Sequence, residues 1–165
     1  MLTSGSYFIN REAAETAIEL TLPLISEAMK RPGVCPGGFL FIVIMDPLLT
    51  PACSSFEEAI LHEHAVGDQS QWDADYAAFS RAKAQVAWRT GHDGHLIQEL
   101  RPHLLTAKDT VLWGSIVLDG IVVSASGAHP WYDEAFAGSV AMCLRALAKA
   151  GIYVERANRL FLPAE

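Results

Sequence analysis

The sequence predicts a mixed α/β (α+β) domain in which helices cover a mainly antiparallel sheet. Apolar residues recur at helical spacing in several segments. Two short apolar runs, residues 116–118 and 121–125, flank Asp119-Gly120, which is a strong two-residue hairpin signal. Regular strand–helix–strand repeats are missing from the pattern, so a parallel sheet is not expected.

The pattern of the first half of the chain predicts a helix, a strand and an extended segment. Residues 10–31 have helical spacing, but Pro23 should kink or divide the helix. Residues 39–45 form a continuous apolar run, typical of a strand buried on both faces. Residues 57–64 fit either a strand or a helix, and we favour an extended segment.

The second half predicts two long helices around the hairpin. Residues 71–90 carry one apolar stripe, and Gly91 follows at the expected end of the helix. A short helix over residues 95–105 should be interrupted at Pro102. Residues 132–150 predict the last helix, which we expect Gly151 to end, with a partly apolar tail over residues 152–165.

Composition restricts the class of protein. The 165 residues suffice for one domain, which we expect to span residues 1–165. Of these residues 51% are hydrophobic and 19% charged, which leaves apolar surface for partner subunits and favours a homo-oligomer. The net charge of −7 and the scattered Lys and Arg residues argue against nucleic acid as a partner.

Neither a membrane nor an oxidising compartment is indicated. No apolar run approaches the roughly 20 residues that span a bilayer, and residues 1–10 lack the features of a signal peptide. Cys35, Cys53 and Cys143 are odd in number and widely spaced, so we expect reduced thiols. A cytoplasmic protein with no membrane partner is the expectation.

The corner after the hairpin is the first candidate site. The second strand ends at Ser126-Gly127 and a helix begins near Pro130, so backbone N–H groups without helical partners could hold a ligand there. His129 could ligate iron or, with Asp133, transfer a proton. Alternatively, His129 or Ser126 only caps the helix and Asp133 only complements its dipole.

Other side chains could contribute to the same site. Lys83 lies near the apolar stripe of its helix, where its ammonium group either reaches a carboxylate or ligand, or extends to solvent. Trp113 and Trp131 flank the corner and could pack on a flat ligand, or only on the core. His62 and His64 would share one strand face and could bind a metal, although an exposed edge strand is the commoner explanation for such a pair.

Known catalytic and nucleotide-binding signatures are missing. The sequence has no Gly-x-Ser-x-Gly elbow, no phosphate-binding Gly-rich loop and no dinucleotide fingerprint. We therefore assign no catalytic residue from the sequence.

Several short motifs resemble the GlcG-like and HbpS-like family of haem-degrading or haem-binding domains. They are Ile42–Asp46, Lys83-Ala84, Trp113-Gly114-Ser115-Ile116, Asp119-Gly120, Ala125-Ser126-Gly127 and Asp133-Glu134. Trp72 with Arg81-Ala82-Lys83 is similar to an uncharacterised branch of that family. The family's Gly-Gly-Ile-Pro strand has lost its Pro and one Gly here, which leaves the ligand open.

The resemblance implies a profilin-like, three-layer α/β/α domain with about five strands, assembled into homodimers or larger rings. It implies a pocket for haem or a similar tetrapyrrole, in a protein accessory to a catabolic pathway. The expected ligand-binding residues are Lys83, Trp113, Gly114, Ser126, Gly127, His129 and Asp133. Of these, His129 is the candidate haem-iron ligand and Lys83 faces a propionate.

Two alternatives stay open at this point. The protein could be a small catabolic enzyme acting on an organic acid or an aromatic breakdown product. Lys83 would then hold the substrate carboxylate, while His129 and Asp133 would move a proton. It could also be an assembly module without a ligand.

Overall fold

The computed structural model describes residues 5–164. Its helices are α1 (Arg11–Met29), α2 (Phe56–Ala59), α3 (Tyr76–Thr90), α4 (Gly94–Leu100) and α5 (Pro130–Asn158). Its strands are β1 (Leu40–Met45), β2 (Ile60–Val66), β3 (Ser115–Leu118) and β4 (Ile121–Ser126). The chain also forms two short 3-10 helices, η1 (Gln69–Gln71) and η2 (Pro102–Leu104).

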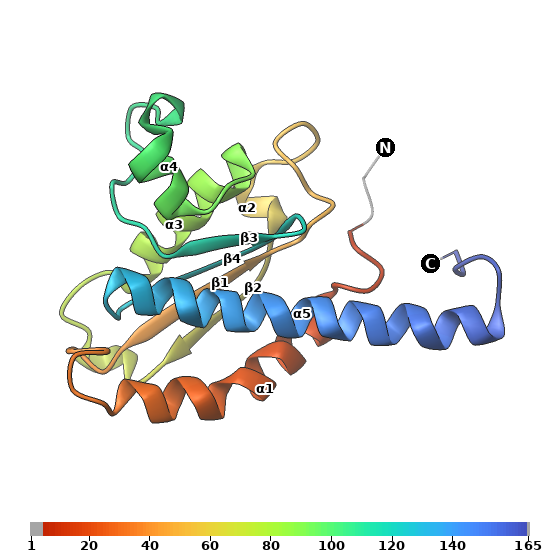
Figure 1. Cartoon of the computed structure of the whole chain (residues 1–165), viewed down its shortest axis with the longest axis horizontal. Coiled ribbons are helices and arrows are strands. Elements are labelled where there is room, and N and C mark those ends of the chain that lie inside the picture. Colours follow the sequence, from red (N-terminus) through yellow and green to blue (C-terminus); the bar gives the residue numbers. More distant parts are fainter. Residues whose placement is uncertain (1–4, 165) are drawn as a thin grey trace.

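The strands form one antiparallel sheet in the order β2-β1-β4-β3, and helices cover both of its faces (Figure 1). On one face, α1 and α5 pack over a core that includes Ile42, Val123 and Leu144. On the other, α3 packs over a core that includes Phe41, Val43 and Ala84. The predicted fold class is confirmed, but the sheet of the described residues has four strands, not the expected five.

The central strand β1 is buried on both faces, as its continuous apolar sequence predicts. All six of its residues are buried, because it pairs with β2 on one side and β4 on the other and has helices above and below. The predicted hairpin over Asp119-Gly120 joins β3 to β4, and both turn residues have positive φ as that turn requires. β2 and β3 are the edges of the sheet.

The first helix is not divided at Pro23, and the prediction that Gly151 ends the last helix is wrong. α1 runs through Pro23 without a break, and Pro23 lies on its exposed side, where water can satisfy the carbonyl that loses its donor. α5 runs through Gly151 to Asn158. A Cβ atom at position 151 would lie 2.7 Å from the Phe8 ring, so glycine lets Phe8 pack against the helix.

The segment around residues 56–66 and the start of α3 also differ from the prediction. Ser55 and Glu58 form a reciprocal capping box that starts α2, and β2 follows immediately. α3 begins at Tyr76, not near residue 71, because the Asp75 carboxylate caps it by accepting from the Ala78 N–H. Residues 69–71 form η1 instead.

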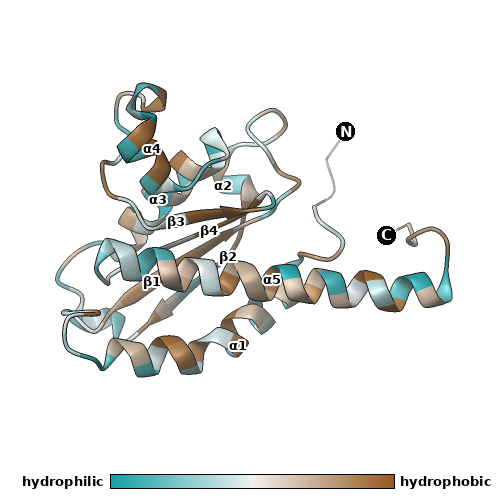
Figure 2. Ribbon diagram, viewed as in Figure 1, coloured by the Kyte–Doolittle hydropathy of each residue, from teal (hydrophilic) through white to brown (hydrophobic). Residues whose placement is uncertain are grey.

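Helix α5 carries apolar residues along its whole length, and in the half that projects beyond the other elements they alternate with hydrophilic ones (Figure 2). By length and composition alone it could cross a membrane, and it is the one helix among residues 5–164 that could. Its first half packs into the core through Phe136, Val140 and Leu144. This packing is compatible with a soluble protein.

Candidate functional site

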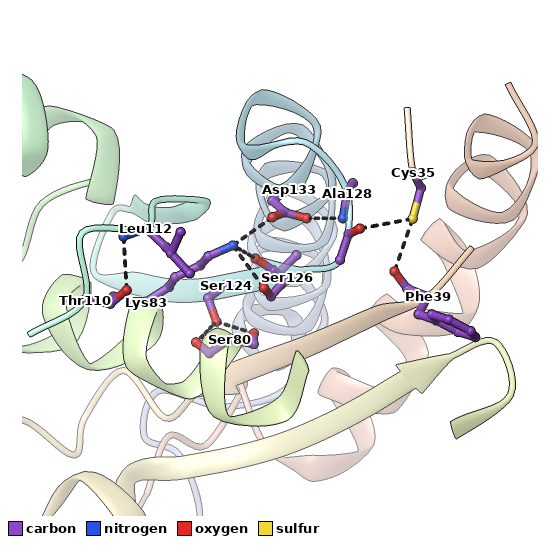
Figure 3. A network of polar contacts seen from close by, with 12 residues as sticks. Cys35, Phe39, Ser80, Lys83, Thr110, Leu112, Ser124, Ser126, Ala128 and Asp133 are labelled. Atoms are coloured by element: carbon purple, nitrogen blue, oxygen red, sulfur yellow. Dashed lines mark hydrogen bonds and ion pairs between the residues drawn. The ribbon is translucent and has the colours of Figure 1, made fainter. Parts of the chain in front are cut away.

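A buried ion pair connects α3 to the start of α5 behind the end of β4 (Figure 3). Lys83 Nζ donates to Asp133 Oδ2 at 2.7 Å, and the two side chains are 3% and 1% exposed. The same ammonium group donates to the Ala125 carbonyl and to Ser126 Oγ, both at 3.1 Å. Lys83 therefore does not extend to solvent but reaches a carboxylate.

The hydrogen-bonding capacity of this pair is taken up within the fold. An ammonium group has three N–H donors, and all three of those on Lys83 have protein acceptors. The second Asp133 oxygen accepts from the Ala128 N–H at 2.9 Å. Lys83 is thus not free to meet a propionate or a substrate carboxylate in this arrangement.

Two glycines of the predicted set allow close packing around the pair. Gly114 has φ +143°, and a Cβ atom there would lie 2.6 Å from Asp133 Cβ and 3.2 Å from Lys83 Nζ. Gly127 has φ +140°, and a Cβ atom there would overlap the Phe39 carbonyl. The structure thus gives each a packing role: Gly114 covers the ion pair, and Gly127 lets the 126–129 turn lie against the start of β1.

Burial dominates the electrostatics of the pair. It raises the pKa of Asp133 to about 6, although Lys83 and the Gly127 and Ala128 N–H groups act in the opposite direction. Burial likewise lowers the pKa of Lys83, against the attraction of Asp133. With a pKa of about 6, Asp133 is mainly ionised at neutral pH and can act as the anionic partner of Lys83.

His129 and Trp131 lie side by side at the N-terminus of α5. Their ring centroids are 5.0 Å apart at 10°, and the Trp131 side chain is 57% exposed. His129 is the N-cap residue of α5, but its side chain makes no capping hydrogen bond. The imidazole is therefore not used to start the helix, contrary to one of the two sequence interpretations.

A cleft of about 310 Å³ lies between α4 and the first turns of α5. Its lining combines carboxylates, an imidazole and leucine side chains: Asp93, His95, Leu96, Glu99, Leu100 and Glu134. Burial raises the pKa of Glu134, whereas the nearby His95 lowers it. The Asp93 carboxylate accepts from the Val117 N–H at 2.7 Å, which fixes the start of α4 to β3.

Two tryptophans lie near residues of this cleft without lining it. Trp113 stacks on His95 with centroids 4.2 Å apart at 17°. Trp131 precedes Glu134 by three residues on α5, so the two side chains lie on one face of that helix. The cleft thus offers carboxylates for a positive charge, and the Leu96 and Leu100 side chains for a hydrocarbon part.

The structure separates the predicted site into two parts. Lys83, Gly114, Ser126 and Asp133 meet in the buried network, while Trp113 and His129 lie nearer the surface. The sequence interpretation assigned no role to Leu96, Glu99 or Leu100 of α4, nor to Glu134. One local signal was available, because Asp93 could have been read as the N-cap of a helix that carries His95 and Glu99 on one face.

The predicted pairing of His62 and His64 on one strand face is confirmed, with ring centroids 6.4 Å apart. Glu63 points to the other face and forms an ion pair with Arg81 at 2.6 Å. Within residues 5–164 no group of three or more His, Cys, Asp or Glu side chains is placed to hold a metal ion. The histidine pair therefore lacks the third ligand that a metal site would need.

Comparisons with protein-family models, curated proteins and solved structures found no match to this chain. The resemblance to GlcG-like and HbpS-like proteins accordingly stays a prediction.

Proposed function

We propose that this chain is a cytoplasmic, homo-oligomeric protein that binds a small organic molecule in the cleft between α4 and α5. The observation that carries the proposal is the cleft lining, in which Glu99 and Glu134 accompany Leu96 and Leu100. Its volume of about 310 Å³ lies at the lower end of small-molecule sites. The preferred ligand is an organic ammonium ion with a short apolar or aromatic part.

The charge of the cleft argues for a cation and against an acid. Asp93, Glu99 and Glu134 bring three carboxylates, and His95 is the one basic group in the lining. A carboxylate ligand would meet repulsion there, whereas an ammonium group would find acceptors. Trp113, stacked on His95, adds an aromatic surface beside these acceptors.

In this account the buried ion pair supports the cleft and does not touch the ligand. Asp133 directly precedes Glu134 on α5, and its carboxylate is fixed by Lys83 and by the Ala128 N–H. Holding Asp133 in place sets the rotation of the first turns of α5. It therefore sets the direction in which Glu134 points, as a supporting residue does in a preorganised site.

Calorimetric titration with two molecules of similar shape and opposite charge tests the proposal. We expect saturable binding of phenethylamine to the wild type and none of 3-phenylpropionate. Glu134→Gln should weaken amine binding at least tenfold, or about 1.4 kcal/mol, while Glu57→Gln, at an exposed position of α2, should not. Equal binding of the two molecules, or an unchanged affinity in Glu134→Gln, would overturn it.

Haem is the second candidate ligand, and one observation favours it. His129 begins α5 without using its imidazole as a cap, and that ring lies beside the exposed Trp131. His129 could hold a haem iron and Trp131 could pack on the macrocycle. Lys83 would not contribute, because its three donors bind Ala125, Ser126 and Asp133.

Hemin titration followed in the visible range tests this second candidate. A saturable Soret shift at one haem per chain that is lost in His129→Ala, but kept in His103→Ala, would support it. His103 is an exposed histidine on η2 and serves as the control. A shift that is absent or identical in the two variants would remove haem from consideration.

A further inference from the structure

The edge strand β2 carries two histidines on the face of the sheet that α1 covers. β2 pairs with β1 along one side, and no strand among residues 5–164 pairs with its other side. The residues opposite His62 and His64 on β1, Ile44 and Ile42, belong to the core under α1 and α5. The two imidazole rings are stacked at 28° with centroids 6.4 Å apart, so they extend in the same direction.

Both imidazoles are available as metal ligands. Neither makes a hydrogen bond to another residue that the structure describes, and both side chains are half-buried. Burial lowers the pKa of each histidine below its ordinary 6.5, so both are neutral at pH 7, as metal ligands must be. The α1 charges that act on His62, from Glu15 and Arg11, are opposite in sign and form an ion pair with each other. One chain thus supplies two of the four ligands that a zinc ion takes.

A two-fold axis through Glu63 would supply the other two ligands. Antiparallel pairing of β2 with β2 of a second copy about this axis sets His62 opposite the partner's His64, and His64 opposite the partner's His62. Directly opposite Cβ atoms lie about 4.5 to 5.5 Å apart, and residues two apart on one strand about 6.7 Å. Four imidazoles on one face of the joined strands would therefore surround one point, as a tetrahedral zinc site requires.

The free side of β2 permits such pairing. Residues 60–66 include no proline and no lysine, which commonly protect edge strands, and residues 62–66 pair with β1 without a bulge. Glu63 would lie opposite the partner's Glu63 on the other face of the sheet. Its charge is already compensated, because its two carboxylate oxygens accept from Arg81 at 2.6 and 2.8 Å.

Helix α1 leaves room beside this edge. A groove of about 350 Å³ lies where the end of α1 meets the end of β2, and its lining includes Ser26 and Met29 of α1 with Val66 of β2. The two-fold axis that makes the β2 strands antiparallel also makes the two α1 helices antiparallel. They would flank the four imidazoles from either side.

From this arrangement we propose that His62 and His64 of two copies together bind one divalent transition-metal ion, with zinc as the preferred ion, between paired β2 strands. The site is incomplete in one chain, so metal binding and pairing depend on each other. The two four-stranded sheets become one continuous sheet across the axis. The inference rests on the homo-oligomeric part of the proposed function and is independent of the cleft.

Zinc titration, followed by calorimetry and light scattering, tests the site. Wild-type protein treated with EDTA and desalted should take up half a zinc ion per chain, and zinc-loaded protein should be at least a dimer. His62→Ala and His64→Ala should each weaken zinc binding at least about tenfold, with unchanged circular dichroism, because each removes two of four ligands. The control His103→Ala, at an exposed position of η2, should bind zinc like the wild type. Cobalt in place of zinc should show the visible absorption of a tetrahedral ion.

The outcomes separate the metal site from homo-oligomerisation. No zinc uptake, uptake of one ion per chain, or an unchanged affinity in both His62→Ala and His64→Ala would overturn the metal site. An oligomer that persists in any of these cases leaves homo-oligomerisation standing. A protein that is monomeric with and without zinc would overturn both. Phenethylamine binding by the same variants reports on the cleft separately.

Discussion

Lys83 and Asp133, 50 positions apart in the chain, form a 2.7 Å ion pair in which both side chains are almost completely buried. The pair joins α3 to α5 at the end of β4. There the Ala125 carbonyl and Ser126 Oγ accept the other two hydrogen bonds of the Lys83 ammonium group. Removing one partner of a buried ion pair destabilises the fold strongly, because the other charge stays buried without a partner. Replacing both partners by well-packed apolar residues destabilises it much less. The stability of this corner therefore depends on both residues together.

Single and double replacements of the pair should show that dependence. Lys83→Met and Asp133→Leu should each lower the free energy of unfolding by about 3 to 5 kcal/mol, because each leaves one buried charge without its partner. The double variant should lose much less than the sum. Urea denaturation of the four proteins measures the coupling, and additive losses would contradict it.

The raised pKa of Asp133 gives this residue a defined contribution to pH dependence. Its folded pKa of about 6 lies above the ordinary value of 3.8, so the folded state holds the proton more tightly than the unfolded state. Its contribution to the free energy of unfolding should thus increase as the pH falls from about 6 to 4, and be lost as the pH rises through 6. Asp133→Asn should lack this slope in denaturation curves between pH 4 and 7. If the free energy of unfolding changed with pH in the same way in the wild type and in Asp133→Asn, Asp133 would not be the group responsible.

Gly114 should tolerate no side chain, whereas Gly138 should. Gly114→Ala places a methyl group 2.6 Å from Asp133 Cβ at a φ of +143°, so we expect a loss of at least about 2 kcal/mol. Gly138 lies within α5, and a Cβ atom there would make ordinary contact with Ile116 at 3.7 Å. Gly138→Ala should stabilise the protein by about 0.5 to 1 kcal/mol. Thermal unfolding measures both changes: the midpoint temperature should fall in Gly114→Ala and rise in Gly138→Ala.

Amine binding in the cleft should depend on the ionisation of Glu134. Burial raises the pKa of this carboxyl above its ordinary 4.5, so it takes up a proton at a higher pH than an exposed glutamate. Phenethylamine affinity should therefore fall on acidification, and the fall should begin above the range of an ordinary glutamate. Glu134→Gln should remove most of this dependence, and an identical pH profile in the variant would exclude Glu134 as the acceptor.

The sequence allowed the central strand, the hairpin and the position of the long helices to be predicted, because each has a local cause. It did not reveal that α5 passes through Gly151, since the reason is a contact with Phe8 about 140 positions earlier. It likewise did not reveal the start of α3, although Asp75 is a recognisable N-cap. Such boundaries depend on which of several capping residues the tertiary structure uses.

The candidate site was predictable only in part. The position of Lys83 near an apolar stripe left two possibilities, a carboxylate or ligand partner and extension to solvent, and the structure shows a carboxylate. The turn before α5 placed Asp133 near the end of β4. Sequence spacing could not show that the two neutralise each other, because they meet only across the sheet. It also could not show that α4 packs beside the start of α5, and hence that His95 and Glu134 share a cleft.

The most direct test of the proposed binding site is amide and indole chemical-shift mapping on the ¹⁵N-labelled protein during titration with phenethylamine. We predict saturable shifts of the Trp113 indole N–H and of the His95 and Glu134 amides, with the Lys83 amide unchanged. Shifts confined to Lys83 and residues 126–129 would contradict this account, because they would place the ligand at the buried ion pair instead of the cleft.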